Sequence, residues 1–199
     1  MTPKGVGSLE NKSFGERKEG KNITCRAKIM FSNHKSTISK IIRDALAEKR
    51  RTEILHDSHE EQKIPDELMN EAGVYIRIMQ DGKCMEESGS VYVVMPFIKA
   101  LTSALERITY AKDVLVELNI ITDIKPLVSE EQIGGHGFVI EYGPYNAVLL
   151  PQELDRFHDI TAEEKLNALC KKANIHEDAW KEKSAKKFIF TCETMEFTF

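Results

Sequence analysis

The chain of 199 residues has few cysteines, no long apolar run and no recognisable export signal. Its four cysteines (Cys25, Cys84, Cys170 and Cys192) are widely spaced and form no CxxC pair, so we expect free thiols rather than a zinc site. No apolar stretch approaches the ~20 residues that a membrane-spanning helix needs. The N-terminal sequence MTPKGVGSLE lacks the apolar core of a secretory signal. These absences predict a cytoplasmic protein that does not span a membrane.

The charge is unevenly distributed along a chain of globular composition. Hydrophobic residues make up 41% and charged residues 30%, which is typical of one ordinary domain or two small lobes. Residues 1–35 carry eight Lys or Arg against three Asp or Glu, whereas the remainder carries 20 against 29. A basic arm can contact nucleic acid or an anionic surface. The body lacks a basic face, however, so we expect a solvated arm, partly extended or disordered, and no nucleic-acid partner.

Hydrophobic periodicity predicts the order of helices and strands. A helix capped by Ser36 or Thr37 precedes a hairpin whose turn is Asp81-Gly82. A second helix begins at Pro96, and residues 114–121 form a buried strand. The remaining elements are a hairpin at residues 138–142 and 147–150, a helix opened by a capping box at residues 161–164, and a final strand over residues 186–199. This mixed order without βαβ repetition predicts an α+β fold with a largely antiparallel sheet.

Three local patterns are compatible with chemistry, and each also has a structural interpretation. His56 and His59 have a spacing that could bind zinc on a helix, but they lie in a charged run without HExxH, which favours a solvated loop. The Gly134-Gly135-His136-Gly137 segment could hold an anion on its backbone N–H groups. It matches no phosphate-binding motif, and a strand follows it, which favours a turn. We therefore expect no metal and no cofactor.

The third pattern is the returning strand of the first hairpin. It places Cys84 close to Glu86, Glu87 and Ser88. The two carboxylates oppose formation of a thiolate, so Cys84 is a poor candidate nucleophile. Without a functional role, this segment would be a hairpin strand with an exposed acidic rim. Similarly, the single tryptophan, Trp180, is expected to be a packing anchor.

Several segments together resemble one known family. The strand LVELNIIT resembles a "VEVSVLT" strand, and IGGHGFVIEYGPYNAVLLPQE resembles a "GxHGLxI…G…LLLPQV" segment. IPDELMNEAGVYIRI resembles the entry into the family's first hairpin, and the capped helix, KAN, DAW and FIFTCETMEF resemble its ending. These segments are similar to the AMMECR-one domain family, which is widespread in archaea. The resemblance covers residues 36–199 and is most specific in the C-terminal half; residues 1–35 lie outside it.

The resemblance implies a fold and a cleft. Family members are built as two lobes of mostly antiparallel or mixed β-sheet flanked by helices, around an inter-lobe cleft that has been proposed as an active site. The family has no settled reaction, and genomic association with Memo-like and radical-SAM proteins has suggested a modification system. The oligomeric state does not follow from the resemblance.

The chain departs from the family where chemistry is expected. The family signature is an LRGCIG run after the first hairpin turn, and only its final glycine, Gly89, is retained here. Met85 takes the place of the arginine, Glu86 of the first glycine and Glu87 of the cysteine. Cys84 falls where the family has leucine, so it does not inherit the role of the signature cysteine. A "DPRF" loop expected before residue 114 is also missing.

Two hypotheses follow. In the first, the chain is an AMMECR-type domain with an altered or lost catalytic signature, which binds a partner protein or a small ligand in the cleft. In the second, it is an enzyme of a modification pathway linked to Memo-like and radical-SAM proteins, with a carboxylate as acid or base. The candidate cleft residues are Glu86, Glu87, Ser88, Gly89 and His136.

Overall fold

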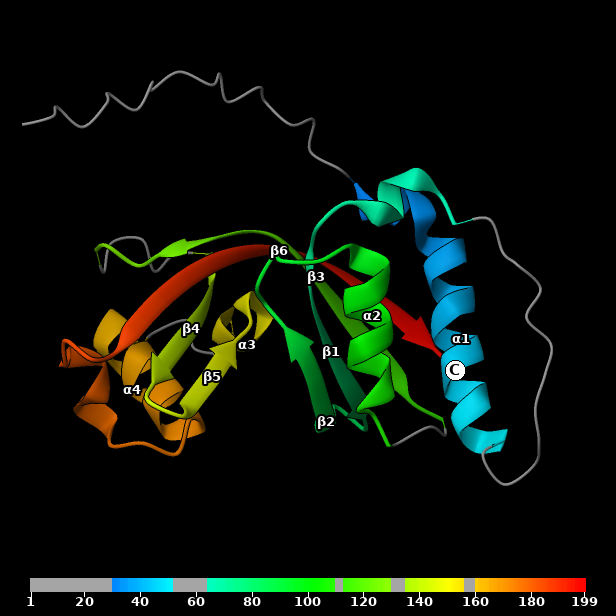
Figure 1. Ribbon diagram of the computed structural model, residues 1–199. Helices are drawn as coiled ribbons and strands as arrows, with labels where there is room; N and C mark the ends of the chain where they lie inside the picture. The colour runs from blue at the N-terminus through cyan, green and yellow to red at the C-terminus, as the bar shows by residue number, and fades with distance from the viewer. Residues whose placement is uncertain (1–29, 52–63, 110–112, 130–134, 156–159) are drawn as a thin grey trace, which may run out of the picture.

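The computed structural model describes residues 30–51, 64–109, 113–129, 135–155 and 160–199 (Figure 1). Within these residues the chain is an α+β protein, as the sequence predicts. The helical elements are η1 (Phe31–His34), α1 (Lys35–Arg51), η2 (Asp66–Met69), α2 (Phe97–Glu106), α3 (Pro151–Asp155), α4 (Ala162–Lys172) and η4 (Glu177–Lys181). The strands are β1 (Gly73–Gln80), β2 (Lys83–Ser90), β3 (Leu115–Pro126), β4 (Gly137–Tyr142), β5 (Tyr145–Leu149) and β6 (Lys186–Thr198).

One curved six-stranded sheet organises the fold. Its order is β2-β1-β3-β6-β4-β5, and every neighbouring pair is antiparallel. The long strands β3 and β6 pair from Leu115↔Thr198 to Pro126↔Phe188, and β6 then continues its pairing with β4. Figure 1 shows β6 bending across the whole molecule, with α1 and α2 at one end and α4 at the other. The two ends of the molecule are therefore joined by a shared sheet.

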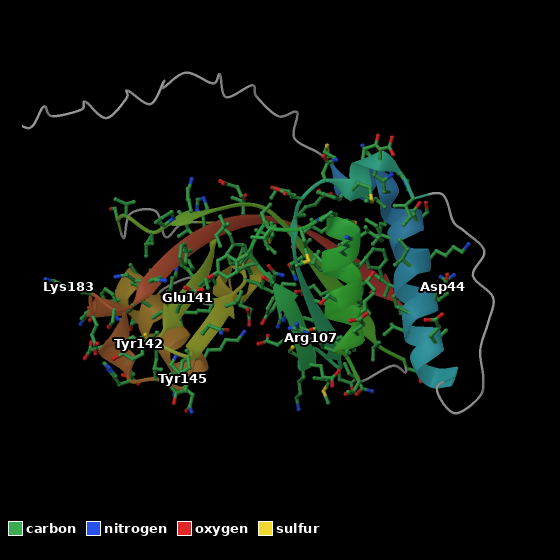
Figure 2. All side chains as sticks on the ribbon, in the orientation of Figure 1. Asp44, Arg107, Glu141, Tyr142, Tyr145 and Lys183 are labelled. Atoms are coloured by element: carbon green, nitrogen blue, oxygen red, sulfur yellow. The ribbon has the colours of Figure 1, made fainter. Side chains whose placement is uncertain are left out.

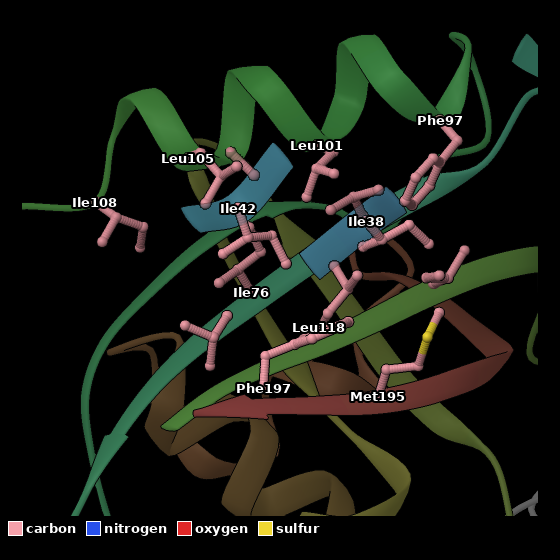
Figure 3. Close-up of a cluster of buried hydrophobic side chains, with 14 of the residues drawn as sticks. Ile38, Ile42, Ile76, Phe97, Leu101, Leu105, Ile108, Leu118, Met195 and Phe197 are labelled. Atoms are coloured by element: carbon pink, nitrogen blue, oxygen red, sulfur yellow. The ribbon is translucent and has the colours of Figure 1, made fainter. Parts of the chain in front are cut away.

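The first core lies where α1 and α2 cover one face of β1, β3 and β6. Ile38 and Ile42 of α1 meet Leu101 and Leu105 of α2 above the apolar side chains of the sheet (Figure 3). The apolar positions of α1 recur at helical spacing, which explains why this helix buries one face. The residues of this cluster that are fully buried include Phe31, Leu68, Ile76, Ile78, Phe97 and Leu118.

Part of the segment assigned to the N-terminal arm is packed against this core. The Phe31 ring lies 4.9 Å from the Phe97 ring, centroid to centroid, and Phe31 is completely buried. The backbone N–H groups of Phe31 and Ser32 donate to the Glu193 carboxylate at 3.1 and 2.7 Å. Residues 1–29 lie outside the described part of the chain, and so do Cys25, His56 and His59.

The second core lies between α4, η4 and the hairpin of β4 and β5. Thr161 and Glu164 form the predicted capping box at the start of α4. Trp180 is 8% exposed, and its Nε1–H donates to Asn167 Oδ1 at 2.6 Å. The prediction that Trp180 is a packing anchor is confirmed.

Some element boundaries differ from those predicted. Helix α1 begins at Lys35, so Ser36 and Thr37 lie inside the helix and do not cap it, and β3 extends beyond residue 121 to Pro126. Strand β5 ends at Leu149, because Pro151 begins the short helix α3, a position that proline favours. In the part of the chain described, no helix is long and apolar enough to cross a membrane.

Candidate functional site

The face of the sheet opposite the first core carries polar side chains. Along β1, Val74, Ile76 and Ile78 belong to that core, so strand alternation directs Tyr75 and Arg77 to the other face. The strand register places Glu117 beside Arg77 and Asn119 beside Tyr75. Three of these residues are almost fully buried, with exposed fractions of 3% for Arg77, 7% for Glu117 and 0% for Asn119. Buried polar groups need partners, so this face must be covered by hydrogen-bonding side chains.

Helix α3 supplies part of that cover. Gln152 Nε2 donates to Glu117 Oε1 and to Asn119 Oδ1, both at 2.7 Å. Arg77 Nη1 lies 3.2 Å from Glu117 Oε1, and Arg77 Nη2 lies 3.9 Å from Glu153 Oε1. A buried arginine is tolerated when carboxylates surround it in this way. Gln152 and Glu153 thus connect α3 to the polar face of the sheet.

Asn119 is the most connected residue of this network. Its Nδ2 donates to the Tyr75 carbonyl oxygen at 3.3 Å and to Glu117 Oε1 at 3.2 Å. Its Oδ1 accepts from Thr194 Oγ1 at 2.9 Å as well as from Gln152. Asn119 therefore satisfies its hydrogen-bonding capacity with groups from β1, β3, β6 and α3.

A second bridge connects β2 to α4. Lys172 Nζ lies 3.1 Å from Glu87 Oε2 and 3.4 Å from Glu153 Oε1. Glu87 pairs with Arg77 in the sheet register and therefore belongs to the polar face. Burial raises the pKa of the Tyr75 hydroxyl, and the nearby Glu87 carboxylate raises it further. The raised pKa keeps the Tyr75 hydroxyl neutral at physiological pH, beside the ion pair of Glu87 with Lys172.

Tyr75, Glu87 and Lys172 border a pocket of about 460 Å³. Small-molecule sites are usually ~300–1,000 Å³, so the pocket is large enough for a small ligand. The residues that line it come from both ends of the sheet: Tyr75, Glu87, Ser88, Gly89, Ser90, Val91, Tyr92, Arg107, Val139, Glu141, Asn146, Ala147, Val148 and Lys172. Figure 2 labels Arg107 at the end of α2 and Glu141 on β4, in the two different halves.

A tyrosine–carboxylate contact also crosses the pocket. The Tyr92 hydroxyl donates to Glu141 Oε1, and the Tyr92 ring packs edge-on against Phe188 with centroids 6.1 Å apart. Burial raises the pKa of Tyr92, and the hydrogen bond to Glu141 raises it further. The pocket is thus bounded by two bridges, Tyr92–Glu141 and Glu87–Lys172.

The candidate residues from the sequence fall into two groups. Glu87, Ser88 and Gly89 line the pocket, whereas Glu86 and His136 are not among its lining residues. Strand alternation directs the Glu86 and Ser88 side chains to the face opposite Glu87. The Ser88 hydroxyl is buried and has no hydrogen-bond partner among the residues that the structure describes.

Glu86 instead contacts the segment that follows α2. Its Oε2 accepts from the Thr109 N–H at 2.8 Å, and Thr109 Oγ1 also donates to its carboxylate. His136 directly precedes the first residue of β4, whereas the pocket involves Val139 and Glu141 further along that strand. The structure therefore does not bring His136 into this pocket with Glu87.

Sequence reasoning missed several residues of the site. Tyr92, Arg107 and Lys172 come from three separate segments, and no local pattern connects them. One signal was available for the buried network. Polar residues alternate inside strands whose other residues are apolar, as in VYIRIM and LVELNII. A buried strand with polar residues at every second position indicates a polar, covered face.

No cluster of three or more His, Cys, Asp or Glu that could hold a metal ion occurs in the described ranges. The three cysteines in those ranges are free: Cys84 is exposed, Cys170 buried and Cys192 half-buried. Cys84 Sγ lies 3.4 Å from the Glu86 carbonyl oxygen. The residues that line the pocket therefore offer carboxylates, cationic side chains, phenol hydroxyls and backbone groups, and none of them is a cysteine.

Comparison with known proteins establishes the family. Residues 39–195 match the AMMECR1 family. The chain belongs to the AMMECR1 family. This agrees with the resemblance carried by the hairpin segments and the C-terminal strand.

Relatives match over shorter stretches. A protein of Methanocella arvoryzae is 43% identical over 67 residues, which is 34% of this chain and 33% of the relative. A protein of Methanococcoides burtonii is 35% identical over 80 residues, 37% of this chain and 40% of the relative. The match to an Aquifex aeolicus protein is 34% identical and covers 35% of each. The chain thus spans only about 33–40% of the length of these relatives.

A solved structure shares the fold. The crystal structure of uncharacterised protein PH0010 from Pyrococcus horikoshii superposes with a TM-score of 0.65 at 21% sequence identity. The match covers 80% of this chain and 89% of that protein. At this identity the likeness supports the arrangement of the sheet and helices, not the chemistry of the site.

Proposed function

We propose that this AMMECR1-family protein is a binding domain that receives a small ligand or a segment of a partner protein in the pocket between Tyr92–Glu141 and Glu87–Lys172. The observation that carries the proposal is the position of Glu87. By resemblance it takes the place of the signature cysteine, and here its carboxylate is 3.1 Å from Lys172 Nζ at the pocket wall. A carboxylate held in an ion pair recognises or orients a ligand, but it does not supply the nucleophile that a cysteine supplies.

The composition of the pocket supports binding. Apolar side chains (Val91, Val139 and Val148) provide contact area, and a few polar groups with fixed partners provide orientation. We also propose that residues 36–199 form one AMMECR-type domain of two intertwined lobes, preceded by a basic N-terminal arm at residues 1–35. We also propose that the protein acts in the cytoplasm.

A second function is favoured by one observation. Tyr75 and Glu87 lie close together at the pocket, and a phenol beside a carboxylate can deliver and accept a proton. In this alternative the protein is an enzyme acting on a bound substrate, within the modification pathway suggested by the family resemblance. The carboxylate, and not a thiol, is then the acid or base.

A thermal-shift screen of a chemically diverse small-molecule library tests the first function. Hits that stabilise the wild-type protein are measured again on Glu87→Gln and on Glu163→Gln. Glu163 is a matched control, because it also pairs with a lysine (Lys181 Nζ, 2.7 Å) but lies on the exposed surface of α4. Shifts lost in Glu87→Gln and kept in Glu163→Gln support the pocket. Shifts that are equal in all three proteins overturn it.

Mass spectrometry of the recovered hits separates the two functions. A binding domain returns each ligand chemically unchanged. Conversion of a ligand by the wild-type protein, abolished in Glu87→Gln while binding persists, establishes the enzyme instead.

A further inference from the structure

Both free edges of the sheet border the same pocket. The sheet order makes β2 and β5 the two outermost strands. Residues 87–90 of β2 line one side of the pocket, and residues 146–148 of β5 line the other. The bend of β6 visible in Figure 1 brings these edges toward each other, as in a barrel that has not closed. Edge strands carry backbone N–H and C=O groups without a strand partner, and these groups are a template for another chain.

We propose that the pocket accepts an extended peptide segment, which adds to the edge of β2 as a further strand and places an acidic group beside Arg107. This inference rests on the proposed binding function and names its ligand class. In recognition by strand addition, backbone hydrogen bonds provide affinity and pockets for alternate side chains provide specificity. The two structural requirements are an approachable strand edge and an adjacent apolar surface.

The pocket side of β2 meets the first requirement. Ser88, Gly89 and Ser90 follow one another there, and none of them has a bulky side chain that would shield the backbone. Gly89 has a φ of +133°, and a Cβ at this position would lie 2.0 Å from the Val74 carbonyl oxygen. The close approach of Gly89 to β1 holds this part of β2 in place, and residues 87–90 line the pocket.

The far side of the pocket meets the second requirement. Val139 of β4 and Val148 of β5 are buried apolar residues that pair across the hairpin and line the pocket. Side chains of a strand lying along β2 alternate in direction, so every second one points to the same face. Those that face β4 and β5 would contact this apolar surface, which selects small or β-branched residues.

The charged residues that line the pocket explain why the proposed peptide carries an acidic group. Lys172 is engaged by Glu87 and Glu153, and Glu141 is engaged by Tyr92 and by Lys186 at 4.0 Å. Arg107 is exposed at the pocket and makes no ion pair with any residue that the structure describes. Its guanidinium is the lining cation left for a ligand, and guanidinium groups bind carboxylates in a bidentate manner. An aspartate or glutamate side chain, or a C-terminal carboxylate, is the complementary group.

The test uses N-acetylated pentapeptides in a positional-scanning library, with binding to the full chain measured by fluorescence anisotropy. The best acidic sequence is then made in two N-methylated forms, which block alternate backbone N–H donors in one register or the other. Strand addition uses only one set, so we expect one form to lose roughly tenfold or more in affinity and the other to lose much less. Equal affinity of both forms and the unmodified peptide overturns the inference.

The substitution Arg107→Gln tests whether the Arg107 guanidinium binds the acidic group of the peptide. We expect this substitution to lower the affinity for the acidic peptide about tenfold. The affinity for the amide counterpart of the peptide (Asp→Asn or Glu→Gln) should fall less. Arg43→Gln is the control, because Arg43 is an exposed arginine that lies over the Phe199 ring, on α1. If no peptide binds but non-peptide ligands still depend on Glu87, the peptide inference fails and the binding function stands. If neither class binds, both fail.

Discussion

Lys172 Nζ on α4 lies 3.1 Å from Glu87 Oε2 on β2, although the two residues are 85 positions apart in the chain. The side chains are 26% and 34% exposed, so the ion pair is only partly shielded from water. It joins the outermost strand of one end of the molecule to the helix that covers the other end. The pocket lies at this junction, so interactions that hold the two ends together also determine its shape.

The first prediction concerns this ion pair. Glu87→Gln leaves Lys172 with only Glu153, and we expect the free energy of unfolding to fall by about 1 kcal/mol. Glu163→Gln removes an ion pair whose side chains are 54% and 47% exposed, and it should cost at most about 0.5 kcal/mol. Urea denaturation measures both values. Equal losses would mean that the Glu87–Lys172 pair behaves as an ordinary surface pair.

The second prediction concerns the buried network. Asn119→Leu removes an amide with no exposed surface and leaves the amide of Gln152 and the hydroxyl of Thr194 without their shared acceptor. We expect a loss of roughly 2–4 kcal/mol in the free energy of unfolding. Asn70→Leu is the control, because the exposed Asn70 amide makes a local hydrogen bond to the Glu67 carbonyl oxygen at 2.9 Å. It should change stability by about 0.5 kcal/mol or less. A similar, small effect of both substitutions would contradict the network's role.

The third prediction uses two glycines with positive φ. Gly89→Ala adds a Cβ that would lie 2.0 Å from the backbone of β1, so we expect a loss of at least ~3 kcal/mol. Gly82→Ala at the turn has a φ of +74° but nothing within 4 Å of the added Cβ. It should cost only about 1–2 kcal/mol, the price of the left-handed conformation. Thermal unfolding followed by circular dichroism ranks the two variants, and a reversed order would refute the steric argument.

The fourth prediction concerns pH. The pKa of Tyr92 is raised by burial and by Glu141, so the folded state favours the protonated phenol. Its contribution to stability is complete below the unfolded pKa of about 10 and is lost as pH rises through the folded pKa. Tyr92→Phe should therefore be less stable than the wild type at about pH 7, by about 1 kcal/mol, and the difference should shrink above about pH 10.

Urea unfolding at several pH values follows this difference. Tyr145→Phe is the control, because Tyr145 is an exposed tyrosine at the start of β5. A stability difference between wild type and Tyr92→Phe that stays constant as pH rises above about 10 would show that Tyr92 is not linked to the titration.

Sequence patterns predicted much of the fold, because turns, helix caps and amphipathic helices depend on interactions between residues that are close together in the chain. The Asp81-Gly82 turn, the capping box at Thr161 and the apolar stripe of α1 each depend on residues a few positions apart. The family resemblance added the overall topology. Helix α3 was not predicted, since five residues beginning with Pro151 are too few to show a periodicity.

The site was less accessible to prediction, because its contacts are long-range. The sequence placed Glu87 and Gly89 at a functional position, and both line the pocket. It also selected His136, since a histidine among glycines suggests an anion site. His136 lies just before β4, whereas the pocket is lined further along that strand, near Glu141. As site residues all of these remain predictions, which the ligand experiments address.

The most direct test of the central claim is mapping of ligand-induced chemical-shift changes by NMR spectroscopy on the isotope-labelled full chain. The ligand is the best binder from the screens, titrated to saturation. The account predicts that the largest changes occur at backbone amides of residues 87–92 and 146–148, with Arg107 and Lys172 side chains affected. Changes concentrated elsewhere, for example on α1 and α2, with these amides unmoved, would contradict it.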